Sequence, residues 1–127
     1  PIHRIPSWIE VIIRPSIDEL RQLYNSSKIF LHTSHWEGWP LPPMEAMACG
    51  CAIVSVGNRG VCEFLTNQED ALIVPIGDKK VLLENLIRVI SDFTLSKKLA
   101  ENSHKTAQNY HWDSCCDTIE KILTTEI

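Results

Sequence analysis

Residues 37–50 read EGWPLPPMEAMACG, and the apolar run CAIVSV follows at 51–56. Glycine and proline crowd the first half of this stretch and predict a turn. Met44 to Cys49 then favours a short helix, which Gly50 is placed to end. The following run is apolar with little alternation, as expected of a strand that is covered on both faces. The stretch therefore predicts a loop, a helix and a buried parallel strand in succession.

Strand and helix patterns alternate on both sides of this stretch. We expect strands at 9–13, 28–33, 51–56 and 71–74, and helices at 17–25, 44–49, 61–65, 79–93, 94–110 and 113–123. Ser16 and Glu19 fit a capping box at the start of the first helix. Short connections favour right-handed crossovers and a parallel sheet. The predicted fold class is α/β: a doubly wound, Rossmann-like sheet of about four strands with helices on both faces and further helices at the C-terminal end.

Large apolar residues indicate which surfaces should be buried. A chain of 127 residues is long enough for one domain with its own core. Trp8 and Trp112 are predicted core residues, and Leu95 and Leu99 lie four residues apart on one helix face. Three residues of the last helix are expected to face the core: Ile119, Ile122 and Leu123.

Composition narrows the classes of partner. The formal net charge is −4 and the basic residues are scattered, which disfavours nucleic acid as a partner. The longest apolar stretch is far short of the roughly 20 residues that a transmembrane helix needs. Five cysteines, with Cys115 and Cys116 adjacent, suit neither a disulfide framework nor a zinc site. Free, mostly buried thiols are expected, which indicates a reducing, cytoplasmic compartment.

Two glutamates frame the most unusual loop. Open parallel sheets bind ligands at the carboxyl ends of their strands, and the loop at 34–43 leaves such an end. It carries Glu37, while Glu45 falls in the first or second turn of the next helix. A helix N-terminus attracts phosphate, and carboxylates accept sugar hydroxyls, so the pattern describes a nucleotide-sugar clamp. Glutamates near helix N-termini also occur as simple dipole partners, and spacing alone leaves both interpretations open.

A family resemblance favours the first interpretation. Residues 37–50 resemble the E-x7-E signature of family 4 retaining glycosyltransferases, which usually reads near EGFGLPPLEAMACG. The likeness continues at 60–63, 71–78 and 110–113 and upstream at 9–34, so that it spans about residues 9–123. It implies the C-terminal, donor-binding lobe of a two-lobed GT-B enzyme, of which residues 1–127 would be a truncated part. An arginine and a lysine that bind the diphosphate, and the acceptor lobe, are expected to lie outside this chain.

The resemblance assigns roles by position. Glu45 looks like the acceptor for the ribose hydroxyls, and Glu37 looks like the catalytic carboxylate, which contacts the donor sugar as a positioning and electrostatic residue. Gly38, Trp39 and Leu41 in the loop are also expected to bind the donor. Arg14 and Pro15 are expected to contact the base of the nucleotide. Pro40 departs from the glycine that is usual there, which removes one amide donor. The stretch 57–60 departs from the usual Gly-Gly turn. Arg59 within it either contacts a phosphate or is exposed to solvent, and the sequence leaves both interpretations open.

Two tryptophans flank the glutamates, and no metal site is expected. Trp39 is predicted to pack in the core or the loop, although sugar stacking is an alternative, whereas Trp36 is free to face solvent or the acceptor. The histidines form no convincing ligand set: His32, His35, His104 and His111. His35 borders the loop, where contact with a ligand and a plain surface role both stay open. The Asp-x-Asp pair that metal-dependent glycosyltransferases of the other fold carry is absent.

The resemblance implies an activity for the full-length protein. A sugar would pass from a nucleoside diphosphate sugar to a polysaccharide, lipopolysaccharide or glycolipid acceptor, with retention of anomeric configuration and with no metal or other cofactor. The acceptor would be bound through the missing N-terminal lobe, the protein would be cytoplasmic or peripheral at the inner membrane face, and the fragment alone would be inactive. The alternative is a non-catalytic nucleotide-binding or interaction module on a degenerate lobe. A phosphorylase would need a pyridoxal phosphate lysine motif, which the sequence lacks.

Overall fold

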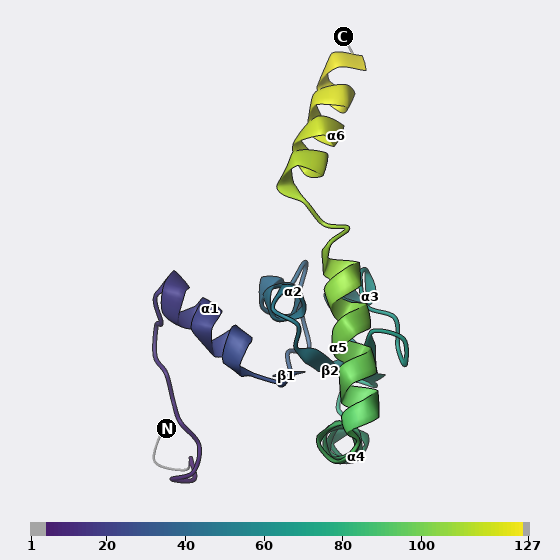
Figure 1. Ribbon diagram of the computed structural model, residues 1–127. Helices are drawn as coiled ribbons and strands as arrows, with labels where there is room; N and C mark the ends of the chain where they lie inside the picture. The colour runs from purple at the N-terminus through teal and green to yellow at the C-terminus, as the bar shows by residue number, and fades with distance from the viewer. Residues whose placement is uncertain (1–4, 126–127) are drawn as a thin grey trace.

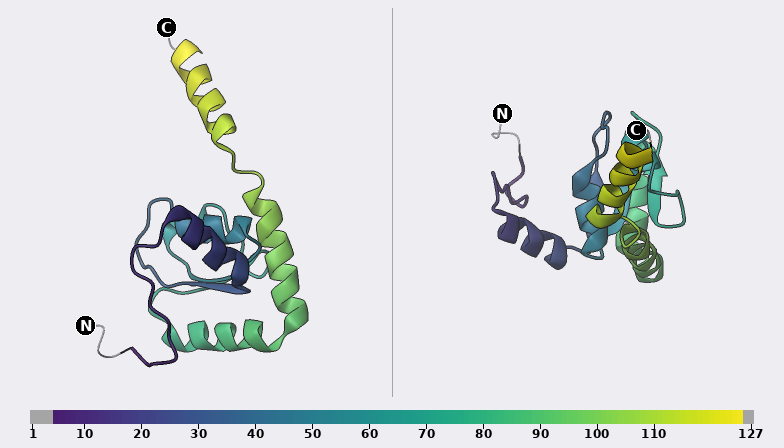
Figure 2. Two further views of the ribbon diagram at one scale, coloured as in Figure 1. Left: turned by 60° about the vertical axis from the view of Figure 1, so that its left-hand side comes forward. Right: turned by 90° about the horizontal axis from the view of Figure 1, so that it is seen from above.

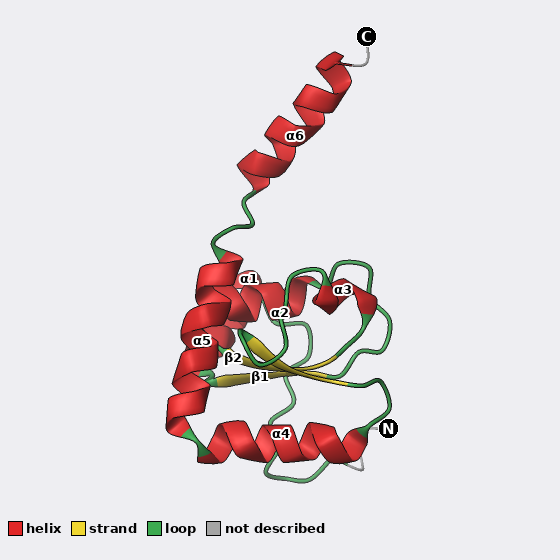
Figure 3. Cartoon of the chain, turned by 90° about the vertical axis from the view of Figure 1, so that its right-hand side faces the viewer, coloured by secondary structure: helices red, strands yellow, loops and turns green. Residues whose placement is uncertain are grey.

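A parallel sheet organises the chain, for which a computed structural model describes residues 5–125. The elements in chain order are α1 (Ile17–Ser26), β1 (Ile29–His32), α2 (Leu41–Ala48), β2 (Ala52–Val56), α3 (Arg59–Cys62), β3 (Ala71–Val74), α4 (Lys79–Ser91), α5 (Phe93–Ala107) and α6 (Trp112–Thr125). The strands lie in the order β1-β2-β3, with α4 under one face and α1, α2 and α3 over the other (Figure 1, Figure 3). Helices on both faces confirm the predicted α/β class.

The central strand is β2, which is buried along its whole length. It pairs with β1 from Ile29↔Ala52 to His32↔Ser55 and with β3 from Ile53↔Ala71 to Val56↔Val74. Because both ladders are parallel, all three strands end at the same edge of the sheet. The loops that follow β1 and β2 therefore leave the sheet side by side.

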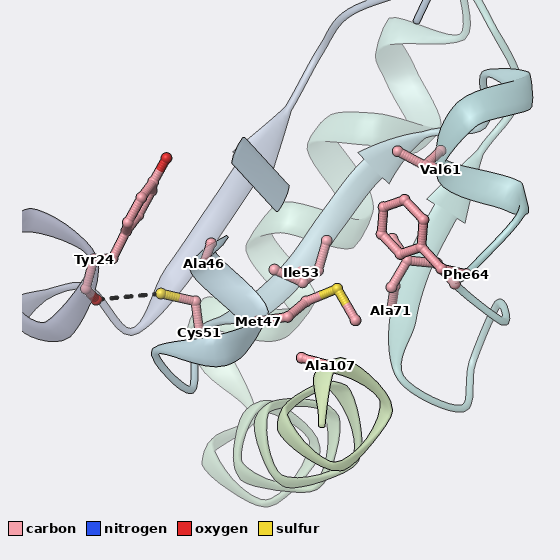
Figure 4. Packing of buried hydrophobic residues seen from close by; sticks show 10 residues of the cluster. Tyr24, Ala46, Met47, Cys51, Ile53, Val61, Phe64, Ala71 and Ala107 are labelled. Carbon is pink, nitrogen blue, oxygen red and sulfur yellow. Dashed lines mark hydrogen bonds between the residues drawn. The ribbon is translucent and has the colours of Figure 1, made fainter. Parts of the chain in front are cut away.

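Each face of the sheet has its own hydrophobic core. On the face of α2, Met47 and Ile53 pack with Val61, Phe64 and the end of α5 (Figure 4). On the opposite face, Ala52, Val54, Leu72, Val89 and Leu99 form the second cluster. Side chains alternate along a strand, so β2 supplies Ile53 to one core and its two neighbours to the other.

The predicted helix signals are present. Ser16 and Glu19 form the capping box: the Ser16 N–H donates to Glu19 Oε2 at 2.8 Å, and the Glu19 N–H donates to Ser16 Oγ at 3.3 Å. The Ser16 hydroxyl also donates to Glu19 Oε2, at 2.7 Å. The Ser16 N–H and hydroxyl both stabilise the charged carboxylate and so lower the pKa of Glu19. Gly50 follows α2 with φ of +80°, the left-handed conformation in which glycine commonly ends a helix.

The strand predicted at 9–13 is wrong. Residues 9–13 form no strand in the structure, their side chains are exposed, and the sheet has three strands rather than about four. An apolar β-branched run becomes a strand only where a neighbouring strand offers hydrogen-bonding partners. None of the described strands lies beside this segment, so its backbone has no neighbouring strand to pair with.

Three predictions of burial are also wrong. Trp8 and Trp112 are 82% and 80% exposed instead of forming core. Helix α6 extends away from the other elements (Figure 2), and the residues expected to face inward are exposed: Ile119, Ile122 and Leu123. All five cysteines are free, but only Cys51 is buried. Residue type and periodicity indicate which side chains could be buried, whereas burial requires a second surface that the described residues do not supply.

Helix boundaries differ slightly from those predicted. Helix α2 begins at Leu41 rather than Met44, and α3 covers Arg59–Cys62 rather than 61–65. Two prolines, Pro42 and Pro43, occupy the first turn of α2, where a missing N–H removes no intrahelical hydrogen bond. Sequence reasoning treated these prolines as loop residues, which placed the start of the helix too late.

Leu99→Ala should destabilise the fold. The Leu99 side chain is fully buried between α5, α4 and β2, so its removal leaves a cavity that costs about 2–5 kcal/mol of unfolding free energy. Leu83→Ala is the matched control, because Leu83 on α4 is 57% exposed and its change should stay within about 0.5 kcal/mol. Urea unfolding followed by circular dichroism measures both, and equal midpoints for the two variants would contradict this packing.

Candidate functional site

The candidate site is the loop at 33–40, which joins the end of β1 to the start of α2. Asn58, a buried residue after β2, holds it in place. Its Nδ2 donates to the Ser34 carbonyl oxygen at 2.8 Å, while its Oδ1 accepts from the Val61 N–H at 3.0 Å. One side chain therefore caps α3 and fixes the loop that leaves the neighbouring strand.

Gly60 brings α3 into close contact with the same loop. A Cβ atom at position 60 would lie 2.7 Å from the Gly38 carbonyl oxygen, 2.7 Å from Pro40 Cδ and 2.9 Å from the Glu37 carbonyl oxygen. These are backbone and proline-ring atoms, which cannot rotate away as a flexible side chain would. Only glycine at position 60 lets the loop that carries Glu37 keep this position.

Glu45 is exposed on α2 and is held by a tyrosine from α1. The Tyr24 hydroxyl donates to Glu45 Oε2 at 3.1 Å. Burial, and secondarily the charge of Glu45 and this hydrogen bond, raise the pKa of Tyr24 to about 12, so the hydroxyl stays protonated at neutral pH. A carboxylate offers about four lone-pair sites, so Glu45 keeps capacity for further donors.

Glu37 lies in the loop beside the end of β1, with its side chain 38% exposed. Its Oε1 is 4.0 Å from Nε2 of His32, the last residue of β1. His32 is buried, and its Nδ1 lies 3.1 Å from Ser55 Oγ on β2. Burial lowers the pKa of His32, while the nearby carboxylate of Glu37 acts in the opposite direction.

The N-terminus of α2 has fewer amide donors than expected. Pro40 is the N-cap and makes no side-chain capping bond, and two more prolines follow Leu41. Proline has no N–H, so Leu41 supplies the only amide donor among residues 40–43. The helix dipole remains, but a phosphate at this turn would find one amide donor among residues 40–43.

The remaining predicted residues fall into two groups. Trp39 is 46% exposed and packs against Phe64 and Tyr110, with ring centroids 5.1 and 5.4 Å away, in agreement with the predicted packing role. Arg14, with φ of +53°, and Pro15 lie in the segment before α1. None of the hydrogen bonds or ion pairs within residues 5–125 joins them to Glu37 or Glu45, so their role in binding the base stays a prediction.

Two depressions flank the loop. One is largely apolar and reaches to the start of α6; its lining residues are Trp39, Leu41, Met44, Tyr110, His111, Trp112 and Cys115. The other lies at the carboxyl ends of β1 and β2, near the start of α4; its lining residues are Thr33, His35, Val56, Gly77, Asp78, Lys79 and Leu82. The loop therefore has accessible surface on either side.

Residues 5–125 contain no group of three or more histidine, cysteine, aspartate or glutamate side chains placed to hold a metal ion. No helix in the same range combines the length and apolar character that crossing a membrane requires.

Sequence reasoning missed four residues that hold the site: Tyr24, His32, Asn58 and Gly60. Each acts across elements that are distant in the chain, such as Tyr24 on Glu45, 21 residues later. A hydroxyl, an imidazole and an amide in these positions carry no local spacing signal. The one signal in the sequence was the position of His32 near the end of a predicted strand, just before the loop, where open parallel sheets bind ligands.

Comparison with known proteins agrees with this architecture. The family described as "Glycosyl transferases group 1" matches residues 6–106. An N,N'-diacetylbacillosaminyl-diphospho-undecaprenol alpha-1,3-N-acetylgalactosaminyltransferase of Campylobacter jejuni is 33% identical over 92 residues, which cover 72% of this chain and 24% of that protein. The chain spans about a third or less of the length of several curated relatives that it matches.

Solved structures share the fold. The C-terminal domain of a glycosyl transferase group 1 family protein from Francisella tularensis has a TM-score of 0.71 and 26% identity, over 78% of this chain and 51% of that one. Anabaena HepE in complex with UDP-glucose has a TM-score of 0.78 at 22% identity, over 84% of this chain and 30% of that one, which is a likeness of fold. Since the family match spans most of the chain and includes both Glu37 in the loop and Glu45 on α2, the chain belongs to the group 1 glycosyl transferases.

Proposed function

We propose that this chain binds the nucleotide-sugar donor of a retaining glycosyltransferase, with Glu45 on the ribose and Glu37 on the sugar. The observation that carries the proposal is the way Glu45 is held. A protonated Tyr24 hydroxyl fixes one carboxylate oxygen at 3.1 Å, while the side chain stays exposed on α2. An exposed carboxylate with a fixed orientation suits a ribose diol, because two hydroxyls donate to acceptors whose positions are already set.

Glu37 has the second role. Transfer breaks the bond between the sugar and the diphosphate, which builds positive charge on the sugar ring and negative charge on the leaving group. A carboxylate beside the ring stabilises the positive charge and orients the sugar hydroxyls. The close contact of Gly60 with the backbone of residues 37–40 keeps that carboxylate in place.

The acceptor belongs to the same proposal. We expect a carbohydrate or glycolipid acceptor, bound through parts of the protein beyond the 127 residues of this chain. The Campylobacter jejuni relative, whose name describes transfer to a sugar on diphospho-undecaprenol, supports an acceptor of this kind. The structural neighbour with bound UDP-glucose supports a nucleoside diphosphate sugar as the donor. No metal or further cofactor enters the proposal.

Glu45→Ala should abolish or strongly weaken donor binding. Loss of charge-assisted hydrogen bonds costs about 1.5–3 kcal/mol, which corresponds to an affinity about 10- to 100-fold lower. Ligand-observed NMR of the chain against UDP-, GDP-, ADP- and dTDP-sugars identifies the donor, and calorimetry then measures its affinity for both proteins. Glu101→Ala, on the exposed surface of α5, is the control and should bind as the unmodified chain does.

Two results would count against this assignment. Equal affinities for Glu45→Ala and Glu101→Ala would remove Glu45 from the ribose site. Silence of the unmodified chain across the panel, repeated with the full-length protein, would favour a non-catalytic module instead of a transferase.

Gly60→Ala should weaken donor binding through the loop. The added Cβ would meet three atoms of residues 37–40 at 2.7–2.9 Å, so the loop must shift. Such overpacking costs about 1–3 kcal/mol of stability, and displacement of Glu37 should lower donor affinity as well. Affinity is measured well below the unfolding temperature so that the two effects separate. Glu63→Ala, at the exposed end of α3, is the control, and unchanged affinity in Gly60→Ala would contradict a positioning role for this contact.

A further inference from the structure

The tautomer of His32 follows from its hydrogen bond to Ser55. The Ser55 hydroxyl donates its single proton to the Val56 carbonyl oxygen at 2.9 Å. Its oxygen can then only accept from the His32 ring, whose Nδ1 lies 3.1 Å away. The proton of a neutral His32 therefore resides on Nδ1, and Nε2 carries a lone pair.

This lone pair faces a carboxylate. Nε2 lies 4.0 Å from Glu37 Oε1, and an ionised carboxylate is also only an acceptor. His32 Nε2 and Glu37 Oε1 are two neighbouring acceptors, so each needs a hydrogen-bond donor. The donor is either a proton added to the imidazole or the hydroxyls of a ligand. Burial lowers the pKa of His32 and so opposes the added proton. Glu37 is the charged group that acts on this ring among the described residues, and Ser55, on the neighbouring strand, does not titrate.

We propose that His32 Nε2 is a second sugar-hydroxyl acceptor beside Glu37, so that the pair recognises two neighbouring hydroxyls of the donor sugar. The proposal rests on the proposed function and adds a specificity-determining residue to that site. Neighbouring ring hydroxyls supply two donors a short distance apart, which matches two acceptors separated by 4.0 Å. A sugar that lacks one of these hydroxyls would leave one of the two acceptors without a donor, which is how such sites discriminate.

Protons and donor sugar should compete for His32. Protonation converts Nε2 into an N–H donor that pairs with Glu37, which removes one acceptor and occupies the other. Donor affinity should therefore fall as the pH falls through the pKa of His32. By linkage, bound donor should lower the pKa of His32 further. If His32 instead acted as a cation for the diphosphate, both changes would have the opposite sign.

The first experiment follows the His32 ring of the unmodified chain by nitrogen-15 NMR from about pH 8 downward to below the range in which histidine ordinarily titrates, because burial lowers the pKa of this ring. It is run without ligand and with the nucleotide sugar that the panel identifies. We expect the neutral ring to carry its proton on Nδ1 and the pKa to be lower with donor bound. A proton on Nε2, or a pKa that is raised or unchanged by the donor, would overturn the proposal.

The second experiment uses two substitutions that separate the ring nitrogens. His32→Asn keeps an amide near Nδ1 for Ser55 but removes the acceptor at Nε2, so donor affinity should fall about two- to tenfold, as for loss of one neutral hydrogen bond. His32→Gln places a carboxamide oxygen near Nε2 and does not titrate, so most of the affinity should remain without the pH dependence. His104→Gln, on the exposed surface of α5, is the control.

The outcomes distinguish this inference from the proposed function. Donor binding that is equal in His32→Asn and His104→Gln, with the same pH profile, overturns the role of His32 and leaves the donor site intact. Failure of the unmodified chain and the full-length protein to bind any nucleotide sugar overturns the proposed function and this inference with it. If either His32 variant fails to fold, the NMR titration of the unmodified chain still decides the question.

Discussion

The parallel pairing of β1 with the buried strand β2 is the constraint on which the site depends. Its register ends with His32 opposite Ser55, so the imidazole and the hydroxyl meet at the edge where both strands finish. A shift of one residue would turn His32 to the other face of the sheet and break this contact. The same edge releases the loop with Glu37 beside the segment that carries Asn58, so one ladder sets the neighbours of the whole loop.

The position of Glu45 depends on the packing of α2 and α1 next to the central strand. Met47 and Ala46 bury the inner face of α2 against Ile53, which fixes the direction of the exposed face. Cys51, directly before β2, donates through its thiol to the Tyr24 carbonyl oxygen at 3.3 Å (Figure 4), and the Tyr24 hydroxyl reaches Glu45. Helix α1 has little buried surface of its own, so this contact with α2 and β2 determines where its tyrosine lies.

Local signals in the sequence predicted what is locally determined. The capping box at Ser16, the glycine after α2 and the apolar run of β2 all act within a few residues, and all are found. The predictions of a strand at 9–13 and of a buried face on α6 were wrong because strand pairing and helix burial depend on a second surface. Periodicity carries no information about that surface. The glutamates were identifiable because their spacing is a motif, whereas Tyr24 and His32 act across 21 and 23 residues and leave no local pattern.

The chemistry of the loop differs from that of an ordinary anion site at a helix terminus. Three prolines at 40–43 leave Leu41 as the single amide donor there, while Glu37 and Glu45 contribute carboxylate oxygens, which accept hydrogen bonds. Acceptors bind hydroxyls well and repel phosphate, so within our proposal this loop discriminates between donors through ribose and sugar hydroxyls. The charge of the diphosphate contributes little to that choice at this turn, and a nucleotide without its sugar should lose the contacts of Glu37 while keeping those of Glu45. Selectivity for the sugar would then lie with the loop after β1, and selectivity for the ribose with α2, the helix that directly follows this loop.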